Sequence, residues 1–220
     1  MDIKEITKKE IFKVSRMGTL YLLDNDNILK IFKEPKRLHE IDKYKYMLKY
    51  INESFIFPFE FIYDSENFYG YITKRATGKT LDLIFSQSNL IELSNNSKNF
   101  ESNLDYVSKG GIILSDFHSS NMIYDGKKIT AIDPDDNDIY RSISEATSTN
   151  QYYHKLEICK LFDANIENNK HMKLVKDNIS KYKYGKFRPS EIILKVKEDI
   201  EGITKEEINT IDDVNNIFRM

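Results

Sequence analysis

The first third of the chain alternates short apolar runs with polar turns, a pattern that is typical of consecutive β-strands. Gly18 and clusters of Asp, Asn, Ser and Glu separate these runs. A longer stretch, 36–52, instead carries Leu, Ile, Tyr and Met at mixed spacings of three and four residues, which predicts an amphipathic helix. We therefore predict a five-stranded antiparallel sheet with one helix. The runs that form the predicted strands are 12–17, 19–23, 28–32, 55–63 and 68–73.

The remaining two thirds of the chain carry patterns that mainly predict helices. Asn89 and Glu92 have the spacing of a capping pair at a helix start. Near the C-terminus, Gly202 is expected to end one helix, and Thr204 with Glu207 is expected to cap the next. The predicted helices cover 89–107, 152–162, 190–201 and 205–218.

Between the first two of these helices, an apolar run and a polar loop lead into two short strands joined by Asp125-Gly126. Both turn positions tolerate φ > 0, which favours a two-residue turn that pairs Tyr124 with Lys127. In that register Asp133, at the end of the second strand, comes alongside His118. The predicted hairpin therefore gathers polar residues from the loop and from the strand end in one place.

Asp116, Asn121 and Asp133 are the residues that this hairpin is expected to bring together. Two carboxylates and an amide oxygen form a group of hard oxygen ligands suited to Mg²⁺, which prefers carboxylates together with phosphate oxygens. Asp, Asn and Ser are also common turn formers. A purely structural, turn-rich hairpin is therefore the alternative interpretation of the same residues.

The composition narrows the classes of protein to consider. The 220 residues, of which 40% are hydrophobic and 31% charged, suffice for one globular domain or two small lobes. A net charge of −2 predicts no overall attraction to nucleic acid or to a membrane. The single cysteine, Cys159, excludes an internal disulfide and a Cys-based zinc cage. The sequence shows no secretory signal and no membrane-length apolar segment, so we expect a cytoplasmic protein, or one in a host cytosol if it is a delivered effector.

The run Asp-Phe-His-Ser-Ser-Asn at 116–121, followed by a strand that ends in Asp133, resembles the catalytic loop and metal-binding aspartate of the protein-kinase-like superfamily. It looks most like the form found in aminoglycoside and choline phosphotransferases and in small bacterial kinases. The compact size resembles Rio/Bud-type atypical kinases. The resemblance implies a bilobal α+β fold with a small antiparallel-sheet N-lobe, one helix in that lobe and a reduced, mostly helical C-lobe. The implied parts are an N-lobe at 1–74, a hinge at 75–79 and a C-lobe at 80–220 that contains the catalytic hairpin 112–136.

For the loop, the resemblance implies three roles. Asp116 would be the catalytic residue that accepts or orients the proton of the acceptor hydroxyl. Asp133 would bind Mg²⁺ bridging the phosphates of ATP, and Asn121 would supply a second, catalytically required metal contact. Asp135 or Asp136 would be available to add a further contact to the metal.

For the small lobe, the resemblance implies an ATP-binding surface. Lys30 occupies the position of the strand lysine that holds the α- and β-phosphates, and Glu40 is the best-placed helix glutamate to pair with it. An edge-strand lysine and a solvated helix glutamate are the structural alternatives. Gly18 lies in the turn that would cover the phosphates. Lys74, directly before the implied hinge, and Ala76, within it, belong to the stretch whose backbone would meet the adenine.

The sequence also departs from the family pattern. One glycine, Gly18, replaces the usual glycine-rich series, and Asp133-Pro134-Asp135 replaces Asp-Phe-Gly. A short polar stretch at 142–150 replaces a long activation segment, so regulation by activation-loop phosphorylation is not expected.

The expected function is an ATP- and magnesium-dependent kinase that transfers the γ-phosphate to a hydroxyl, with a protein Ser/Thr as first choice of acceptor. A small-molecule kinase of the aminoglycoside or choline type and a catalytically inactive pseudokinase are the alternatives. The lysine-rich segment 170–188, interleaved with aromatic residues, leaves open a third class, an RNA-binding adaptor. The alternative for that segment is a solvated lysine-rich surface, and no membrane partner is expected.

Overall fold

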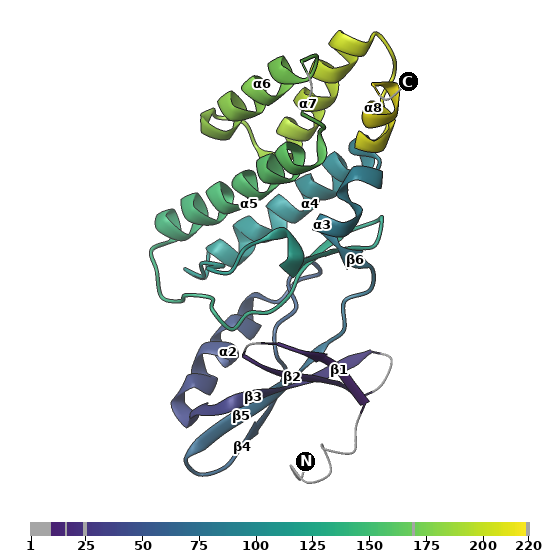
Figure 1. The fold of residues 1–220 in the computed structure, drawn as a ribbon. Helices are drawn as coiled ribbons and strands as arrows, with labels where there is room; N and C mark the ends of the chain where they lie inside the picture. Colours follow the sequence, from purple (N-terminus) through teal and green to yellow (C-terminus); the bar gives the residue numbers. More distant parts are fainter. Residues whose placement is uncertain (1–9, 16, 24–25, 169, 219–220) are drawn as a thin grey trace.

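The computed structural model describes residues 10–15, 17–23, 26–168 and 170–218. The chain forms two lobes stacked end to end, a twisted β-sheet with α2 beside it and a larger lobe made mainly of helices (Figure 1). This arrangement confirms the predicted α+β class with an antiparallel-sheet lobe followed by a helical lobe.

The small lobe contains the predicted five-stranded antiparallel sheet, in the order β1-β2-β3-β5-β4. Alternation along β3 sends successive side chains to opposite faces. Leu29 packs with Ile62 and Ile72 on one face, whereas Phe32 joins the main core on the other. Lys30 shares the face of Phe32, because the two are two residues apart on the strand. The strands are β1 (Glu10–Val14), β2 (Gly18–Leu22), β3 (Asn27–Arg37), β4 (Glu60–Tyr63) and β5 (Asn67–Lys74). Strand β1 ends at Val14 rather than at the predicted residue 17, and β4 begins at Glu60 rather than at the predicted residue 55.

The helix of the small lobe is shorter than the predicted 36–52. Strand β3 continues through Pro35 to Arg37 and pairs there with β5, so the helical segment begins only with the 3₁₀ turn η1 (Leu38–Glu40). Helix α2 (Ile41–Met47) follows and buries Ile41, Tyr44 and Met47, and a second 3₁₀ turn, η2 (Leu48–Tyr50), ends the segment. The helix therefore packs Tyr44 against the sheet face that carries Phe32.

The large lobe begins with a second, three-stranded sheet in the order β6-β7-β8. The helices of the large lobe pack on one another: α4 packs against α7 and α5, and α5 packs against α6 (Figure 1). The elements are β6 (Lys79–Thr80), α3 (Leu81–Ile84), η3 (Phe85–Gln87), α4 (Leu90–Ser108), η4 (Ser119–Asn121), β7 (Met122–Tyr124), β8 (Ile129–Ala131), α5 (Ile143–Asn165), α6 (Lys173–Tyr184), α7 (Pro189–Thr204) and α8 (Ile211–Ile217).

The start of α4 confirms the Asn89 part of the predicted capping pair, since the Asn89 side chain accepts hydrogen bonds from the backbone of Ile91 and Glu92. Helix α5 is longer than the predicted 152–162. Ser142 caps it and accepts from Glu145 N, so the polar stretch 142–150 lies almost entirely in the helix. The apolar pattern missed these turns because their side chains are mostly polar.

The C-terminal helices correct two predicted boundaries. Helix α7 runs through Gly202 to Thr204 and ends at Lys205, whose φ of 61° is left-handed. Helix α8 is capped by Thr210 and Asp213 rather than by Thr204 and Glu207. Both helices are held by buried Ile and Val side chains of the core, so the position of these side chains decides where the helices lie.

One continuous core spans both lobes, from Phe32 and Tyr44 in the small lobe to Phe100 and Phe162 in the large one. The backbone also joins the lobes: Ile56 N donates to Ala131 O at 3.2 Å, and Ala131 N donates to Ser54 O at 2.8 Å. These contacts place the end of β8 directly against the small lobe. No helix within the described part of the chain has the length and apolar character needed to span a membrane.

Candidate active site

A buried asparagine fixes the segment that leads into the predicted catalytic loop. Asn150, on α5, accepts from Leu114 N at 2.9 Å and donates to Ile112 O at 2.8 Å. The same segment forms a two-way backbone pair with the segment that leaves the site, between Ile113 and Asp138 at 2.8 Å in each direction. The entry to the loop and the exit from it are thus tied together by hydrogen bonds in the core.

The hairpin that follows the loop has a different register from the predicted one. Tyr124 pairs with Ile129 rather than with Lys127, so the connection has four residues. The reason is the Asp125 side chain, whose Oδ1 accepts from Lys127 N at 2.8 Å and from Lys128 N at 2.9 Å. The pairing partner moves by two residues, and this shift leaves every side chain on its predicted face.

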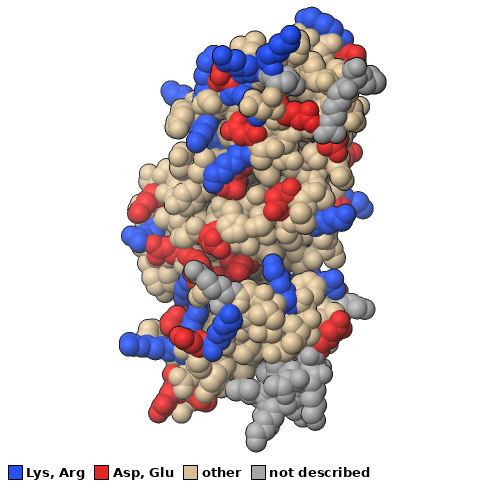
Figure 2. Space-filling model, in the orientation of Figure 1, with Lys and Arg blue, Asp and Glu red and all other residues tan. Residues whose placement is uncertain are grey.

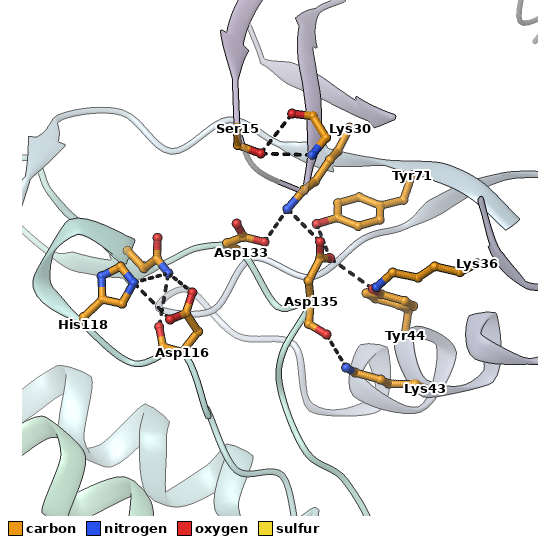
Figure 3. Close-up of polar contacts among 12 residues, drawn as sticks. Ser15, Lys30, Lys36, Lys43, Tyr44, Tyr71, Asp116, His118, Asp133 and Asp135 are labelled. Atoms are coloured by element: carbon orange, nitrogen blue, oxygen red, sulfur yellow. Dashed lines mark hydrogen bonds and ion pairs between the residues drawn. The ribbon is translucent and has the colours of Figure 1, made fainter. Parts of the chain in front are cut away.

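Asp116, His118 and Asn121 form a hydrogen-bonded cluster in the loop. Figure 3 shows Asp116 and His118 side by side. Asn121 Nδ2 donates to Asp116 Oδ2 at 3.0 Å and to the Asp116 carbonyl oxygen at 3.1 Å. His118 Nε2 lies 3.1 Å from Asp116 Oδ1, and these two side chains are 42% and 43% exposed. The Asn121 Oδ1 atom has no hydrogen-bond partner among the described residues. The cluster therefore presents a carboxylate and an amide oxygen to solvent.

Lys30 meets two carboxylates that come from the segment after the hairpin (Figure 3). Its Nζ lies 2.6 Å from Asp133 Oδ1 and 2.7 Å from Asp135 Oδ2. Asp133 adopts a left-handed φ of 59°, which turns the chain sharply between the strand end and Asp135. Lys30 and Asp135 are about equally buried, whereas the Asp133 side chain is 38% exposed.

Two tyrosines satisfy the other oxygen of Asp135. Tyr44 Oη and Tyr71 Oη donate to Asp135 Oδ1 at 3.0 Å and 2.8 Å, and Lys43 Nζ donates to the Asp135 backbone oxygen. Burial alone would raise the pKa of Asp135, but the Lys30 ammonium holds that pKa below its usual range. Burial would likewise lower the pKa of Lys30, and Asp135 with Asp133 raises it instead. Both groups are therefore charged near neutral pH.

Comparison with solved structures finds the kinase PK-1 of the Cydia pomonella granulovirus, with a TM-score of 0.51. The match covers 97% of this chain and 88% of that chain, at 18% sequence identity. No protein-family model and no curated protein sequence matches the chain. The chain has a protein-kinase-like fold. At this level of identity the likeness extends to the fold alone.

Within this kinase-like fold, Glu40 does not take the predicted position beside Lys30. Its carboxylate instead accepts a hydrogen bond from Arg37 N at 3.3 Å, at the start of η1. The acidic partners of Lys30 within the described residues are Asp133 and Asp135. Glu40 is thus used locally, as a cap for the turn that opens the helical segment.

Gly18 has a steric reason for being glycine. It begins β2 opposite Phe32, and a Cβ atom there would approach Ile31 O to 2.3 Å. The Ser15 hydroxyl contacts both the nitrogen and the carbonyl oxygen of Gly18, at 3.1 and 2.9 Å. Gly18 therefore allows close approach of β2 to β3, and its predicted contact with phosphate stays a prediction.

The residues between β5 and β6, where the hinge is predicted, have irregular structure. Lys74 ends β5 with an exposed side chain whose ammonium lies 5.7 Å from the centre of the Phe59 ring. Ala76 is half-buried. Arg75 N donates to Asp26 O at 2.7 Å, which ties this segment to the start of β3. The structure leaves the predicted role of Lys74 and Ala76 at the adenine as a prediction.

A small pocket is lined by the predicted catalytic and metal-binding residues, Asp116, Asn121 and Asp133, together with His118. Among the described residues, no three His, Cys, Asp or Glu side chains gather as ligands of a metal ion. Asp133 Oδ2 and Asn121 Oδ1 are without hydrogen-bond partners within the described residues. Such a donor pair fits Mg²⁺ that is shared with phosphate oxygens and water, which is how this ion is usually bound.

The sequence interpretation missed the residues that hold Asp135. Tyr44 and Tyr71 each carry a hydroxyl group in a segment whose other buried residues are mainly apolar. A buried tyrosine hydroxyl usually has a hydrogen-bond partner. That signal is available in the sequence, but it does not name the partner. Asp136, the other acidic residue considered for the metal, is exposed.

Proposed function

We propose that this protein is an ATP- and magnesium-dependent phosphotransferase that moves the γ-phosphate of ATP to a hydroxyl group. The observation that supports the proposal is one set of contacts. Lys30, from the small lobe, reaches Asp133, and Asp133 lines the same pocket as Asp116 and Asn121 of the large lobe. Two metal-binding oxygens and a solvent-exposed carboxylate then line one pocket, and the cation for phosphates contacts that pocket through Asp133.

Each residue has a defined part in such a reaction. Bound Mg²⁺ would neutralise charge on the transferring phosphate. Asp133 and Asn121 would hold the ion, and Lys30 would bind the α- and β-phosphates. Asp116 would orient the acceptor hydroxyl and take its proton as the hydroxyl oxygen bonds to the γ-phosphorus, while the bond from that phosphorus to the β,γ-bridging oxygen breaks and ADP leaves with the electron pair. Most of the catalysis would thus come from positioning and electrostatic stabilisation.

A protein Ser/Thr is the acceptor that we favour. Asp116 is close to half exposed, so a side chain presented on another protein can approach it. Within the described residues, the helices of the large lobe pack on one continuous core. A small-molecule acceptor is the alternative. Incubation with labelled ATP and either a mixture of protein substrates or a panel of amino alcohols decides between the two classes.

The first test is binding of ATP, measured by thermal shift with and without Mg²⁺. ATP at about one hundred times its Kd stabilises the fold by about 2.7 kcal/mol, a shift of several degrees. Asp133→Ala is expected to abolish the part of the shift that depends on Mg²⁺. Asp177→Ala, which removes an exposed carboxylate on α6 and away from the pocket, is the control and should keep it. No shift in the wild-type protein contradicts the proposal.

A normal shift with ATP but no transfer to any acceptor would favour the pseudokinase alternative. The Asp-Pro-Asp sequence and the single glycine of the predicted phosphate turn are the features that fit a binding module without turnover. Single-turnover measurement of ATP hydrolysis or of autophosphorylation separates a slow enzyme from an inactive one.

A second candidate function rests on the surface of α6. Lys and Arg side chains gather over the end of the molecule farthest from the five-stranded sheet, where α6 lies (Figure 2). Several of its lysines, among them Lys173 and Lys181, are exposed. If this surface binds RNA, affinity should fall steeply with salt and with substitution of these lysines. Binding that is insensitive to both changes excludes that function.

A further inference from the structure

We propose that Asp135, and not Glu40, is the residue that positions Lys30 toward the phosphates, and that Asp135 does so without binding the metal. The inference rests on the proposed ATP-dependent function. It assigns the two aspartates of Asp-Pro-Asp different tasks, with Asp133 turned to the metal and Asp135 to the lysine.

The first reason is that both oxygens of Asp135 are already used. Oδ2 lies 2.7 Å from Lys30 Nζ, and Oδ1 accepts from the hydroxyls of Tyr44 and Tyr71. Only 4% of the Asp135 side chain is exposed. A metal ion that is shared with ATP must also reach solvent-accessible phosphate oxygens. Asp135 would have to give up the tyrosines or Lys30 to bind such an ion.

The second reason is that the groups around Asp135 belong to the same lobe as Lys30, on elements packed against its strand. Tyr71 lies on β5 directly opposite Lys30 in the sheet register. Tyr44 lies on α2, and Lys43 of the same helix donates to the Asp135 backbone oxygen. The sheet and the helix therefore fix the carboxylate, and the carboxylate in turn fixes the ammonium group of Lys30.

The third reason is the contrast with Asp133. Its side chain is 38% exposed, its Oδ1 contacts Lys30, and its Oδ2 has no partner among the described residues. Asp133 can therefore turn to a metal ion while Lys30 keeps the ion pair with Asp135. Glu40 offers no such support, because its carboxylate accepts from Arg37 N at the start of η1.

The decisive experiment compares ATP affinity with Mg²⁺ and with EDTA for Asp135→Asn and Asp133→Asn. Asp135→Asn should weaken ATP binding about tenfold in both conditions, because a positioned cation for the phosphates is lost whether or not metal is present. Asp133→Asn should remove the gain in affinity that Mg²⁺ gives. Glu40→Gln is the control and should leave both affinities unchanged. A loss in Asp135→Asn that appears only with Mg²⁺ overturns the inference and makes Asp135 a metal ligand.

A folded Asp135→Asn protein with unchanged ATP affinity in both conditions also overturns it, since Asp135 would then be structural only. If Asp135→Asn does not fold, Tyr71→Phe takes its place. That variant keeps the ring and the ion pair and removes one of the two hydroxyls that orient the carboxylate. It should weaken ATP binding a few-fold, to the same extent with Mg²⁺ and with EDTA, and an unchanged affinity counts against the inference.

A second measurement needs no nucleotide and so separates this inference from the proposed function. Chemical denaturation of Lys30→Met, Asp135→Asn and the double variant tests whether the two residues act as a unit. Each single change should lower the folding equilibrium constant more than tenfold, and the double variant should lose little beyond either one. Additive losses overturn the pairing. If wild type binds no ATP but the two residues are coupled, the proposed function fails while the Asp135–Lys30 contact stands.

Discussion

The site contains two clusters of charged groups that differ mainly in their surroundings. Lys30 and Asp135 face each other across 2.7 Å with both side chains about 4% exposed. Asp116 and His118 are 3.1 Å apart, yet each is more than two-fifths exposed, at 43% and 42%. A buried charge needs a partner for every polar atom, whereas an exposed one shares its interactions with water. The first cluster is therefore suited to hold the lobes in place, and the second is left accessible to a substrate.

Asp133 lies at the border between the two clusters. One oxygen contacts the buried Lys30, while 38% of the side chain remains exposed at the pocket that Asp116 lines. Aspartates occur in both clusters, so burial, more than residue type, distinguishes the groups that stabilise the structure from the groups that are accessible for a reaction.

Asp116→Asn should affect turnover and spare the fold. The amide retains an oxygen at the same place but cannot take the proton of the acceptor, so kcat should fall about a thousandfold, or about 4 kcal/mol. Because Asp116 is exposed, the free energy of unfolding should change by less than about 0.5 kcal/mol. Steady-state transfer from labelled ATP and urea denaturation measure the two quantities. Wild-type turnover in this variant would remove Asp116 from the mechanism.

Asp135→Ala should do the reverse and destabilise the fold. Removing one partner of a buried ion pair typically costs 3–5 kcal/mol, and about 3 kcal/mol is expected here because Asp133 still faces Lys30. The pKa of Asp135 is lowered and that of Lys30 is raised, so the wild-type pair contributes most between their ordinary values of 3.8 and 10.5. That contribution is lost as pH falls through the lowered pKa or rises through the raised one. Denaturation midpoints across pH should show this plateau in wild type and a smaller one in Asp135→Ala.

The local part of this architecture could be predicted from the sequence. Alternation of apolar residues predicted the strands of the small lobe, and Asn89 predicted the start of α4, because both signals act over a few residues. Side chains that act on the nearby backbone misled the interpretation. Asp125 changed the hairpin turn, and Glu40 capped its own segment. In both cases the prediction named the residue, but a hydrogen bond between its side chain and the nearby backbone gave it a different structural role.

The partners of the buried cluster could not be predicted, because they are set by tertiary packing. In the sequence Lys30 lies among the apolar residues 28–32, where a buried ammonium group needs an anionic partner. The choice between Glu40 and Asp135 depends on where α2 places Tyr44 and where β5 places Tyr71. Neither position follows from spacing along the chain. The exposed loop was easier to predict, since Asp116 and Asn121 lie within one short segment and contact each other directly.

The two histidines His154 and His118 also differ in burial, and the buried one, His154, should make the stability of the fold fall in acid. It is fully buried against the rings of Phe100 and Phe117, and burial lowers its pKa to about 3. The unfolded chain takes up the proton near the ordinary value of 6.5, so stability is present above that pH and is lost as pH falls from 6.5 toward 3. At pH 5 the loss should be about 2 kcal/mol.

Urea denaturation between pH 7 and pH 4.5 measures this loss. His154→Gln, which cannot take up the proton, should flatten the dependence over that range. His118→Gln changes the exposed histidine of the loop and is the control that should keep it. If the free energy of unfolding of the wild-type protein did not change between pH 7 and pH 4.5, the prediction for the buried His154 ring would be wrong.

Tyr71→Phe should give the smallest loss of stability among the changes in the buried cluster. Comparing it with Ser120→Ala contrasts one buried hydrogen bond with one exposed hydrogen bond. The Tyr71 hydroxyl donates to the buried Asp135 carboxylate at 2.8 Å, and the ring packs edge-on against Phe32. The variant keeps the ring and removes one hydrogen bond to a charged group, so the free energy of unfolding should fall by about 1.5 kcal/mol. Ser120→Ala removes a contact of 2.6 Å to His118 in the exposed loop and should change it by less than about 0.5 kcal/mol. Equal losses in the two variants would mean that burial does not distinguish the clusters, because the shorter contact would then count as much as the buried one.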